Sequence, residues 1–291
     1  MDQPSADDRA RLEQVLGAHV KAARRIARGY TPAERWVLQL ADGRSAFAKI
    51  GTNQNTADWL HKEDAIYREL ASRGAEFLPE RLAFVADPQR PILVLEDLSA
   101  AHWPPPWTRA QVDAVLATLD AVHALRLDGL PPLGFMDGAF EGWTQVAADP
   151  EPFLDLGLAD AGWLERALPS LLAAQGELDQ AGDALLHLDV RSDNLCLRDG
   201  RALLIDWNHA CHGNPRIDVA FWAPSLAAEG GPLPEALLPG DGPAAALVSG
   251  FFAARAGLPV IPHAPKVREI QRVQLEAALP WAVRALDLAP L

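Results

Sequence analysis

The stretch 187–207, HLDVRSDNLCLRDGRALLIDW, limits what this chain can fold into more than any other segment. The Asp-Gly pair at 199–200 is typical of a two-residue hairpin turn, and the apolar runs NLCL and ALLI on either side fit its two strands. If the two residues that flank the turn pair with each other, Asn194 and Asp206 lie within one residue of each other at the open end of the hairpin. The sequence therefore predicts an amide oxygen and a carboxylate held together beside buried strands.

Oxygen ligands of this kind suit a small hard cation such as Mg²⁺. Asp189 precedes Asn194 by a short loop, so its carboxylate can face the same space. The alternative is that these polar side chains only cap and turn the strand ends, as a single aspartate at such a position usually does. Several aligned polar residues favour the first interpretation, a site for a divalent cation such as Mg²⁺.

The bulk properties predict a globular protein of two lobes. A chain of 291 residues is longer than one hydrophobic core usually needs. No apolar run approaches the length of a membrane span, and the acidic start, MDQPSADDRARLEQ, is unlike a signal peptide. We therefore expect a cytoplasmic protein that does not act in a membrane. Cys196 and Cys211 lack metal-type spacing and are expected to be packed, reduced thiols.

The formal charge of −13 argues against a nucleic acid partner, because phosphate backbones are bound by clustered lysines and arginines. It would suit a cationic small molecule, although net acidity can simply keep a protein soluble. The sequence is compatible with a monomer or a homodimer.

Residues 1–98 are predicted to form a small lobe of antiparallel strands with one main helix. The Asp-Gly pair at 42–43 indicates a hairpin within RWVLQLADGRSAFAKIG. A helix should follow, with Thr56 as its cap and Gly74 as its stop. RPILVLEDL then has the pattern of a buried strand that ends in acidic residues.

Residues 99–291 are predicted to form a larger, mainly helical lobe. The proline-rich segment 99–107 is a natural connector, and a capping box at Thr108 and Gln111 begins the next helix. Further helices are expected near 244–256 and 265–287, after a turn-rich segment at 224–243.

Two charged residues of the small lobe lie among apolar neighbours. On a helical wheel, Glu63 falls near the middle of the apolar face of the helix after Thr56. A carboxylate there is costly to bury unless a cation meets it. Lys49, in the strand SAFAKIG, has the same need for an opposite charge. The alternative is that both long side chains reach solvent.

Three segments together resemble a known superfamily. HLDVRSDN resembles the catalytic loop of protein-kinase-like enzymes, in which His-x-Asp is followed five residues later by Asn. LLIDW resembles their metal-binding strand end, and GNPRIDVAFW is similar to a segment of aminoglycoside phosphotransferase-like enzymes. The resemblance extends over about residues 29–222 and is closest in 187–222. It implies an α+β, two-lobed, protein-kinase-like fold.

The resemblance implies roles for residues of the catalytic loop and of the strand end that follows it. Asp189 would accept a hydrogen bond and then a proton from the substrate hydroxyl, and Asn194 and Asp206 would hold Mg²⁺. Arg191 stands where many relatives have a basic residue near the transferred phosphoryl group, but it could equally be a surface arginine paired with Asp193.

The resemblance also implies a nucleotide site in the small lobe. Lys49 would pair with Glu63 and contact the α- and β-phosphates. Adenine would bind backbone groups around Glu96, Asp97 and Leu98, at the end of the strand ILVLE.

Two further residues, His187 and Asp218, are implied as supports of the catalytic loop rather than as chemical groups. The chain departs from protein kinases in that ARGYTPAERW offers one glycine, Gly29, for contact with phosphate. It also has Trp-Asn after Asp206 in place of Phe-Gly, and no activation segment ending in Ala-Pro-Glu. These departures disfavour a kinase of protein substrates.

The resemblance therefore implies a phosphotransferase that uses ATP or GTP with Mg²⁺. Its acceptor would be a hydroxyl of a small molecule, such as an aminoglycoside, an amino sugar, a sugar or an amino alcohol. The alternative is a catalytically silent, kinase-like protein that binds nucleotide and acts through a partner. The chain has all five of the residues to which the resemblance gives these roles, which speaks against that alternative. They are Lys49, Glu63, Asp189, Asn194 and Asp206.

Overall fold

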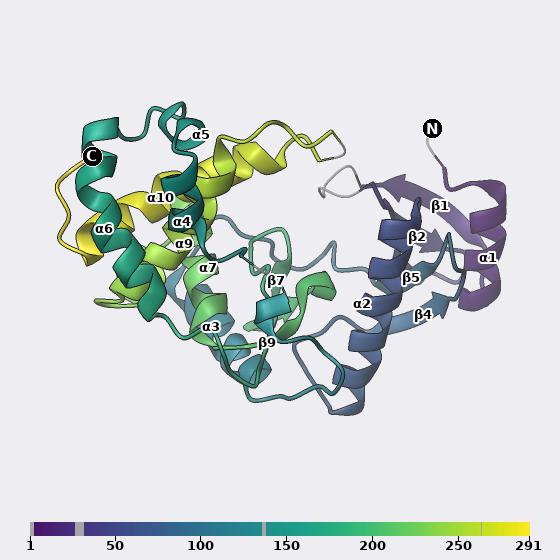
Figure 1. Ribbon diagram of the computed structural model, residues 1–291. Coiled ribbons are helices and arrows are strands. Elements are labelled where there is room, and N and C mark those ends of the chain that lie inside the picture. Colours follow the sequence, from purple (N-terminus) through teal and green to yellow (C-terminus); the bar gives the residue numbers. More distant parts are fainter. Residues whose placement is uncertain (1–2, 27–31, 136–137, 263) are drawn as a thin grey trace. The chain divides into compact units, whose positions relative to one another are not determined.

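The computed structural model describes residues 3–26, 32–135, 138–262 and 264–291. The chain divides into two compact units, which are described separately (Figure 1). The first comprises Met1–Trp103 together with Asp193–Asn208, and the second comprises Pro104–Ser192 and His209–Leu291. The sequence suggested a single boundary after residue 98, whereas the structure groups the hairpin within 193–208 with the first unit.

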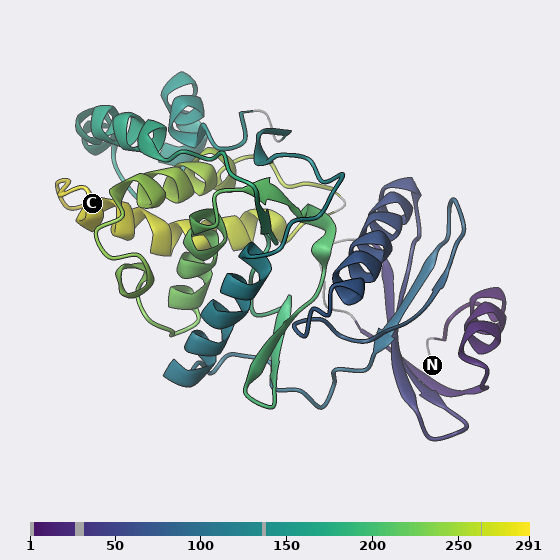
Figure 2. The ribbon, with the colours of Figure 1, turned by 90° about the horizontal axis from the view of Figure 1, so that it is seen from below.

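The first unit is built on a five-stranded antiparallel sheet with the order β1-β2-β3-β5-β4. Its strands are β1 (Val20–Arg25), β2 (Glu34–Leu40), β3 (Ser45–Ile50), β4 (Arg81–Val85) and β5 (Ile92–Glu96). The helices α1 (Ala6–Leu16) and α2 (Gln54–Ser72) cover its opposite faces (Figure 1, Figure 2). Leu12 and Leu16 of α1 pack in one core cluster with Trp36 and Leu38 of β2. This sheet-and-helix arrangement agrees with the predicted small lobe.

Local sequence signals explain how the first unit is assembled. The Asp-Gly pair at 42–43 forms the predicted turn, and the flanking strands pair with Gln39 opposite Ser45. The start of α2 differs from the prediction, because the N-cap is Asn53 and Thr56 is the third residue of the helix. The two side chains exchange hydrogen bonds with each other's backbone N–H groups, which makes a capping box.

The hairpin of β7 (Leu195–Arg198) and β8 (Arg201–Leu204) has the predicted register, with Leu195 opposite Leu204. Both turn residues have positive φ, +51° at Asp199 and +76° at Gly200, as a type I′ turn requires. The hairpin joins the first unit through a backbone bridge between His102 and Leu197. The Leu204 N–H also donates to the Phe77 carbonyl, over 2.8 Å. These bonds are the reason that the hairpin belongs with the first unit.

The second unit is mainly helical. Its helices are α3 (Arg109–His123), α4 (Gly142–Ala148), α5 (Glu151–Leu154), α6 (Ala161–Glu177), α7 (Arg216–Ala228), α8 (Pro234–Leu237), α9 (Gly242–Ala256) and α10 (Val267–Ala285). The short strands β6 (Ala184–Leu186) and β9 (Cys211–Gly213) pair with each other. The helix α9 is largely buried and contacts α4, α6 and α10. A Cβ atom on Gly142 would lie 1.9 Å from the Gly250 carbonyl oxygen, so α4 and α9 can approach this closely only with glycine there.

The helical predictions for the second unit hold with one correction. Thr108 and Gln111 form the expected capping box at the start of α3. The segment 224–243 was expected to be rich in turns from its first residue, but α7 continues through Pro224 to Ala228. Buried side chains such as Trp222 and Leu226 keep the helix packed, so the hydrogen bond that the proline removes does not end it.

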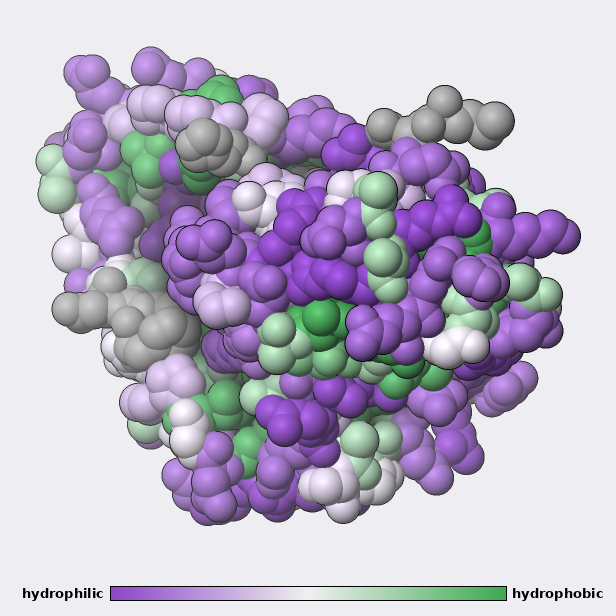
Figure 3. Space-filling view, turned by 90° about the vertical axis from the view of Figure 1, so that its right-hand side faces the viewer, coloured by the Kyte–Doolittle hydropathy of each residue, from purple (hydrophilic) through white to green (hydrophobic). Residues whose placement is uncertain are grey.

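No helix of the described ranges is long and apolar enough to cross a membrane. On the face of the molecule that Figure 3 presents, hydrophilic residues dominate and separate smaller apolar areas. Cys196 and Cys211 are buried free thiols, as the sequence predicted. Burial raises the pKa of Cys196 to about 12, which makes this thiol a packing residue rather than a nucleophile.

Candidate functional site

A buried lysine lies between two carboxylates in the first unit. Lys49 Nζ on β3 is 2.8 Å from Glu63 Oε2 on α2 and 3.0 Å from Asp206 Oδ1, which follows β8. The side chains of Lys49 and Glu63 are only 7% and 1% exposed, whereas that of Asp206 is 25% exposed. The ion pair between Lys49 and Glu63 that the resemblance implied is therefore present, and the prediction that these residues meet is confirmed.

The electrostatics of this cluster keep the lysine charged. Burial lowers the pKa of Lys49, but the charges on Asp206 and Glu63 outweigh it, so the net shift is upward. Burial raises the pKa of Glu63, although Lys49 opposes that shift. The cluster thus holds an ammonium group at a fixed position beside a partly exposed carboxylate, an arrangement that can bind phosphate oxygens on one side and a metal ion on the other.

A second cation, Arg35, was missed by sequence reasoning. It lies on β2 directly opposite Lys49, is 9% exposed, and donates from Nη1 to the Ala33 carbonyl over 2.9 Å. Burial lowers its pKa, while Asp206 and Glu63 act in the opposite direction. A usable signal existed, because the turn at 42–43 fixes the register that brings Arg35 opposite Lys49.

Asn194 and Asp206 lie at the open end of the hairpin, as predicted. The Ile205 N–H donates to the Asn194 carbonyl over 2.9 Å, which ties the two strand ends together. Asp206 has a left-handed backbone, with φ of +66°, and its Oδ1 accepts a hydrogen bond from Asn208 Nδ2. Lys62 Nζ in turn donates to the Asn208 carbonyl over 2.7 Å, which anchors the segment to α2.

These residues fit a magnesium ion by the chemistry of their donors. The side chains of Asn194 and Asp206 offer amide and carboxylate oxygens, which hard divalent cations prefer. Within the described ranges, no group of three or more His, Cys, Asp or Glu residues forms a metal site by itself. Mg²⁺ is usually bound by one or two protein side chains together with substrate phosphates and water.

Residues of the predicted catalytic loop that lie in the second unit surround one buried carboxylate, Asp218 of α7. Its Oδ2 accepts from the His187 N–H over 2.9 Å, and its Oδ1 accepts from the Leu188 N–H over 2.7 Å. The Asp189 N–H donates to His187 Nδ1 over 3.3 Å. Leu188 has a φ of +62°, so these bonds hold a strained backbone immediately before Asp189. The supporting contacts expected of His187 and Asp218 are therefore observed.

Two other residues of the second unit reinforce this loop and were not found from the sequence. His123, in the last turn of α3, has its Nε2 3.0 Å from Asp218 Oδ2. Glu229, after α7, accepts from Ser192 Oγ and, over 2.9 Å, from Trp107 Nε1. Their partners are distant in sequence, and no local motif could have identified them.

Arg191 lies against the aspartate of its own loop. Its Nε is 3.3 Å from Asp189 Oδ1, and the two side chains are 19% and 26% exposed. The sequence left open whether Arg191 is near the transferred phosphoryl group or is a surface residue. Its position beside Asp189 keeps the first interpretation as a proposal.

The predicted adenine-binding segment follows β5. The Glu96 N–H donates to the Glu80 carbonyl, and the Leu98 carbonyl accepts from the Ala101 N–H and from Trp103 Nε1. The proposal that adenine binds near Glu96, Asp97 and Leu98 therefore depends on the other backbone groups of these residues. Gly29, the glycine expected near phosphate, lies outside the described residues.

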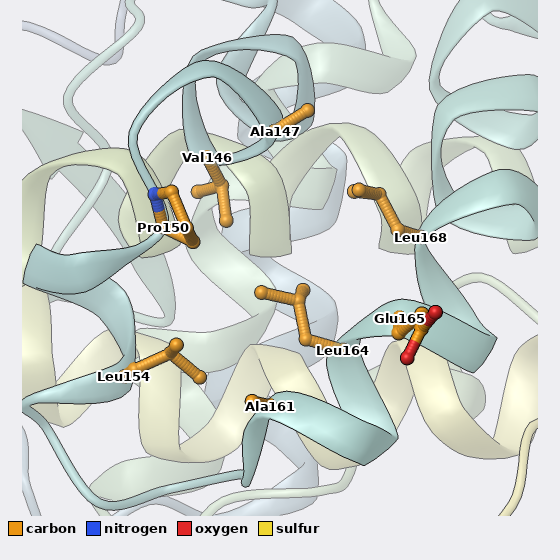
Figure 4. A pocket seen from close by; sticks show the side chains of 8 residues that line it. All are labelled: Val146, Ala147, Pro150, Leu154, Ala161, Leu164, Glu165 and Leu168. Atoms are coloured by element: carbon orange, nitrogen blue, oxygen red, sulfur yellow. The ribbon is translucent and has the colours of Figure 1, made fainter.

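A shallow apolar pocket lies elsewhere in the second unit, among α4, α5 and α6 (Figure 4). Its volume is about 180 Å³, and it is lined by Val146, Ala147, Pro150, Leu154, Ala161, Leu164, Glu165 and Leu168. None of the predicted site residues lines it. Apart from Glu165, its lining is aliphatic.

The sheet with its buried lysine and the helical unit with its braced aspartate define a protein of the kinase-like α+β class. The sequence model of the phosphotransferase enzyme family matches residues 22–242. The chain therefore belongs to the phosphotransferase enzyme family, whose members are small-molecule kinases that act on hydroxyl groups, as the sequence predicted. A search among curated proteins gave no match.

Solved structures show the same fold at low sequence identity. An aminoglycoside phosphotransferase from Alicyclobacillus acidocaldarius is 17% identical with a TM-score of 0.58, covering 94% of this chain and 95% of its own. The choline kinase LicA from Streptococcus pneumoniae is 13% identical with a TM-score of 0.58, covering 97% and 99%. The ADP-bound aminoglycoside phosphotransferase APH(2'')-Ib is 14% identical with a TM-score of 0.53, covering 97% and 89%. The kinase-like fold predicted from the sequence is thus confirmed.

Proposed function

We propose that this enzyme transfers the γ-phosphoryl group of ATP, with Mg²⁺, to a hydroxyl group of a small molecule. The observation that carries the proposal is Lys49, buried within 3.0 Å of both Glu63 and Asp206. A charged ammonium fixed between two carboxylates is suited to binding phosphate oxygens next to a metal ligand. The first unit is assigned nucleotide binding, and the second is assigned the catalytic aspartate and the acceptor.

Lys49 is assigned to the α- and β-phosphates, and Glu63 holds it in place. The choice of ATP is supported by the relative whose structure is ADP-bound, and GTP is the alternative donor. Adenine is assigned to the backbone around Glu96, Asp97 and Leu98. Mg²⁺, held by Asn194 and Asp206, would supply positive charge that neutralises the phosphate oxygens.

Asp189 is assigned to the acceptor hydroxyl. As the bond between the γ-phosphorus and the β–γ bridging oxygen breaks, the acceptor oxygen forms its new bond to phosphorus and its proton passes to Asp189. Arg191, 3.3 Å from that carboxylate, is assigned to the phosphoryl oxygens. Asp218 and His187 position the loop and take no part in the chemistry. Most of the rate enhancement would come from positioning and charge neutralisation.

The acceptor class that these features support is a hydroxylated amine. Two of the relatives of similar fold are named for aminoglycosides and for choline, which carry hydroxyl groups together with amino groups or, in choline, a quaternary ammonium group. The formal charge of −13 favours a cationic acceptor over an anionic one. Sugars and other amino alcohols remain within the proposed class.

The test is phosphoryl transfer from ATP across a panel of aminoglycosides, amino sugars, sugars and amino alcohols, followed by mass spectrometry. Asp189→Asn should remove product formation while leaving nucleotide affinity within about twofold, because the residue acts on the acceptor. Asp183→Asn is the matched control, since Asp183 is 72% exposed in a surface ion pair with Arg126. Full activity of Asp189→Asn would refute its assigned role. Nucleotide binding by the wild type with no transfer to any acceptor would support the silent alternative.

A further inference from the structure

The loop that carries Asp189 is attached to α7 at both of its ends. At the near end, Asp218 in the first turn of α7 accepts from two backbone N–H groups of the loop. At the far end, Ser192 Oγ donates to Oε1 of Glu229, which is the C-cap residue of the same helix. The role of Asp218 as a support has been described, whereas nothing in the proposed function uses Glu229.

Glu229 is an unusual residue for this end of a helix. The C-terminus of a helix carries partial negative charge, so a carboxylate there is disfavoured, and a cation is favoured by about 0.3–1 kcal/mol. Residues that break such a local rule are expected at functional or strained sites. The carboxylate therefore needs an explanation beyond the formation of α7.

The carboxylate of Glu229 is held in one orientation. Its Oε2 accepts from Trp107 Nε1 over 2.9 Å, while its Oε1 accepts from Ser192. The Trp107 ring packs edge-to-face on Trp222 of α7, with 5.7 Å between the ring centroids, and Trp222 is fully buried. Because Glu229 is only half-buried, its side chain would otherwise keep much of its rotamer freedom. The tryptophan pair thus fixes the acceptor to which Ser192 donates.

The attachment at Ser192 bears on the position of Arg191 relative to Asp189. Arg191 immediately precedes Ser192, and its Nε lies 3.3 Å from Asp189 Oδ1. These two side chains are 19% and 26% exposed, and an ion pair that solvent reaches holds its own geometry only weakly. Val190 between them is buried, so the loop is anchored there and at Ser192. Release of Ser192 would let the backbone of Arg191 move relative to Asp189.

We propose that Glu229 is a positioning residue for phosphoryl transfer, and that through Ser192 it holds Arg191 against Asp189. In this role it touches neither nucleotide nor acceptor. The proposal rests on the proposed function, because Asp189 and Arg191 are catalytic only within that function. It predicts that the bond between Glu229 and Ser192 affects kcat and not merely stability.

The test compares kcat for transfer from ATP to any acceptor of the panel above that reacts, in wild type, Ser192→Ala, Glu229→Ala and the double variant. Each single variant should lower kcat by about tenfold, as expected for one lost hydrogen bond to a charged group, while ADP affinity by calorimetry stays within about twofold. The double variant should lose no more than Glu229→Ala, because both substitutions remove the same bond. Glu229→Gln should keep most of the activity, since its amide can accept from Trp107 and donate to Ser192.

A control variant separates positioning from stability. Trp163→Phe removes the bond from Trp163 Nε1 to the Ala289 carbonyl, which is 2.8 Å long and belongs to the same unit. It should lower Tm and leave the kcat of the folded enzyme unchanged. A kcat of Ser192→Ala within twofold of the wild type would overturn the proposal even if its Tm falls. Additive losses of kcat in the double variant would overturn it as well.

Hydrogen exchange followed by mass spectrometry tests the attachment without an acceptor. Peptides that cover 187–192 should lose protection in Ser192→Ala and Glu229→Ala and keep it in Trp163→Phe. Unchanged exchange in both loop variants would overturn the positioning role and leave the proposed function standing. A wild type that binds ADP but transfers phosphate to no acceptor would overturn the proposed function, and the positioning role with it.

Discussion

At the scale of single residues, Leu188 and Asp206 have left-handed backbones although neither is glycine, with φ of +62° and +66°. Such a conformation costs about 1–2 kcal/mol for an ordinary residue. The Leu188 N–H is held by Asp218, and the Asp206 carboxylate is held by Lys49. Strained backbone that persists because surrounding bonds define it is typical of functional sites. Here it directly precedes Asp189 and directly positions the proposed metal ligand Asp206.

Asp218→Ala should therefore be costly. It leaves the buried His187 N–H and the partly buried Leu188 N–H without their acceptor, at about 1–3 kcal/mol for each group. We expect a loss of about 2–5 kcal/mol in the free energy of unfolding in urea, together with most of the phosphotransferase activity. Asp160→Ala is the control, since it removes one N-cap bond of α6 and should cost about 1 kcal/mol without affecting activity. A stability loss no larger than that of the control would contradict the bracing role.

Lys49→Met should make stability depend on pH through Glu63. Burial already raises the pKa of Glu63 against the opposing charge of Lys49, so removing that charge should raise it further. A raised pKa in the folded state gives stability that is present below the unfolded value, near 4.5, and is lost as the pH rises through the folded value. Urea unfolding should show a larger loss at pH 8, about 3–5 kcal/mol, than at pH 5. The double variant Lys49→Met/Glu63→Gln should lose this pH dependence, and equal losses of the single variant at both pH values would refute the argument.

The residues that could be found from the sequence are those whose partners are close in the chain or whose spacing follows a regular period. Asn194 and Asp206 were found because a two-residue turn fixes the register between them. Glu63 was found because its place on an apolar helical face is visible in the sequence. His123 and Glu229 were not, because their partners lie 95 and 37 residues away and only packing brings them together.

At the scale of elements, the hairpin of β7 and β8 depends on a turn in which both central residues have positive φ. Gly200→Ala should strain that turn, since φ of +76° is disfavoured for residues with a Cβ atom, and should cost about 1–2 kcal/mol of stability. Gly176→Ala is the matched control, because it lies in α6 with no atom within 4 Å of an added Cβ, and it should be neutral or stabilising by up to ~1 kcal/mol. Thermal and urea unfolding measure both. Equal effects of the two substitutions would contradict the turn assignment.

Element boundaries were predicted less well than the elements themselves. Asn53 and Thr56 both have capping side chains, and the sequence favoured the wrong one as N-cap because either can begin a helix. Pro224 suggested a turn, but the buried residues around it continue α7 for four more residues. At the start of α2, reciprocal hydrogen bonds between Asn53 and Thr56 decide which residue is the N-cap. At Pro224, packing of the buried neighbours decides that the helix continues.

At the scale of the whole molecule, the linear order of the chain does not reveal how the units are composed. The segment 193–208 includes the last two residues of the predicted catalytic loop, yet its backbone also bonds with Phe77 and His102 of the first unit. These long-range contacts bring Asp206 next to Lys49, which is 157 residues away in the sequence. The motifs predicted a set of candidate site residues, but the unit to which each belongs is a property of the assembled sheet.

The first unit should be the acid-sensitive one. Burial would raise the pKa of Asp8, but hydrogen bonds from Arg90 and Ser5 outweigh it, so the net shift is downward. Hydrogen bonds with His19, the Val20 N–H and Arg9 lower the pKa of Glu13 to about 2. A depressed pKa gives stability that is present above the unfolded value, near 4, and is lost as the pH falls through the folded value. The attachment of α1 to the sheet should therefore weaken between pH 5 and pH 2.

Hydrogen exchange followed by mass spectrometry, corrected for intrinsic rates, can locate this loss. Peptides of residues 6–25 should lose protection between pH 5 and pH 2.5, while peptides of α9, which contains no acidic residue, should keep theirs longer. The double variant Asp8→Asn/Glu13→Gln should already be less protected at pH 5 and should change little on acidification, because the titrating groups are gone. If α9 opens as early as α1, or if the double variant keeps the wild-type pH dependence, these carboxylates are not the source of acid sensitivity.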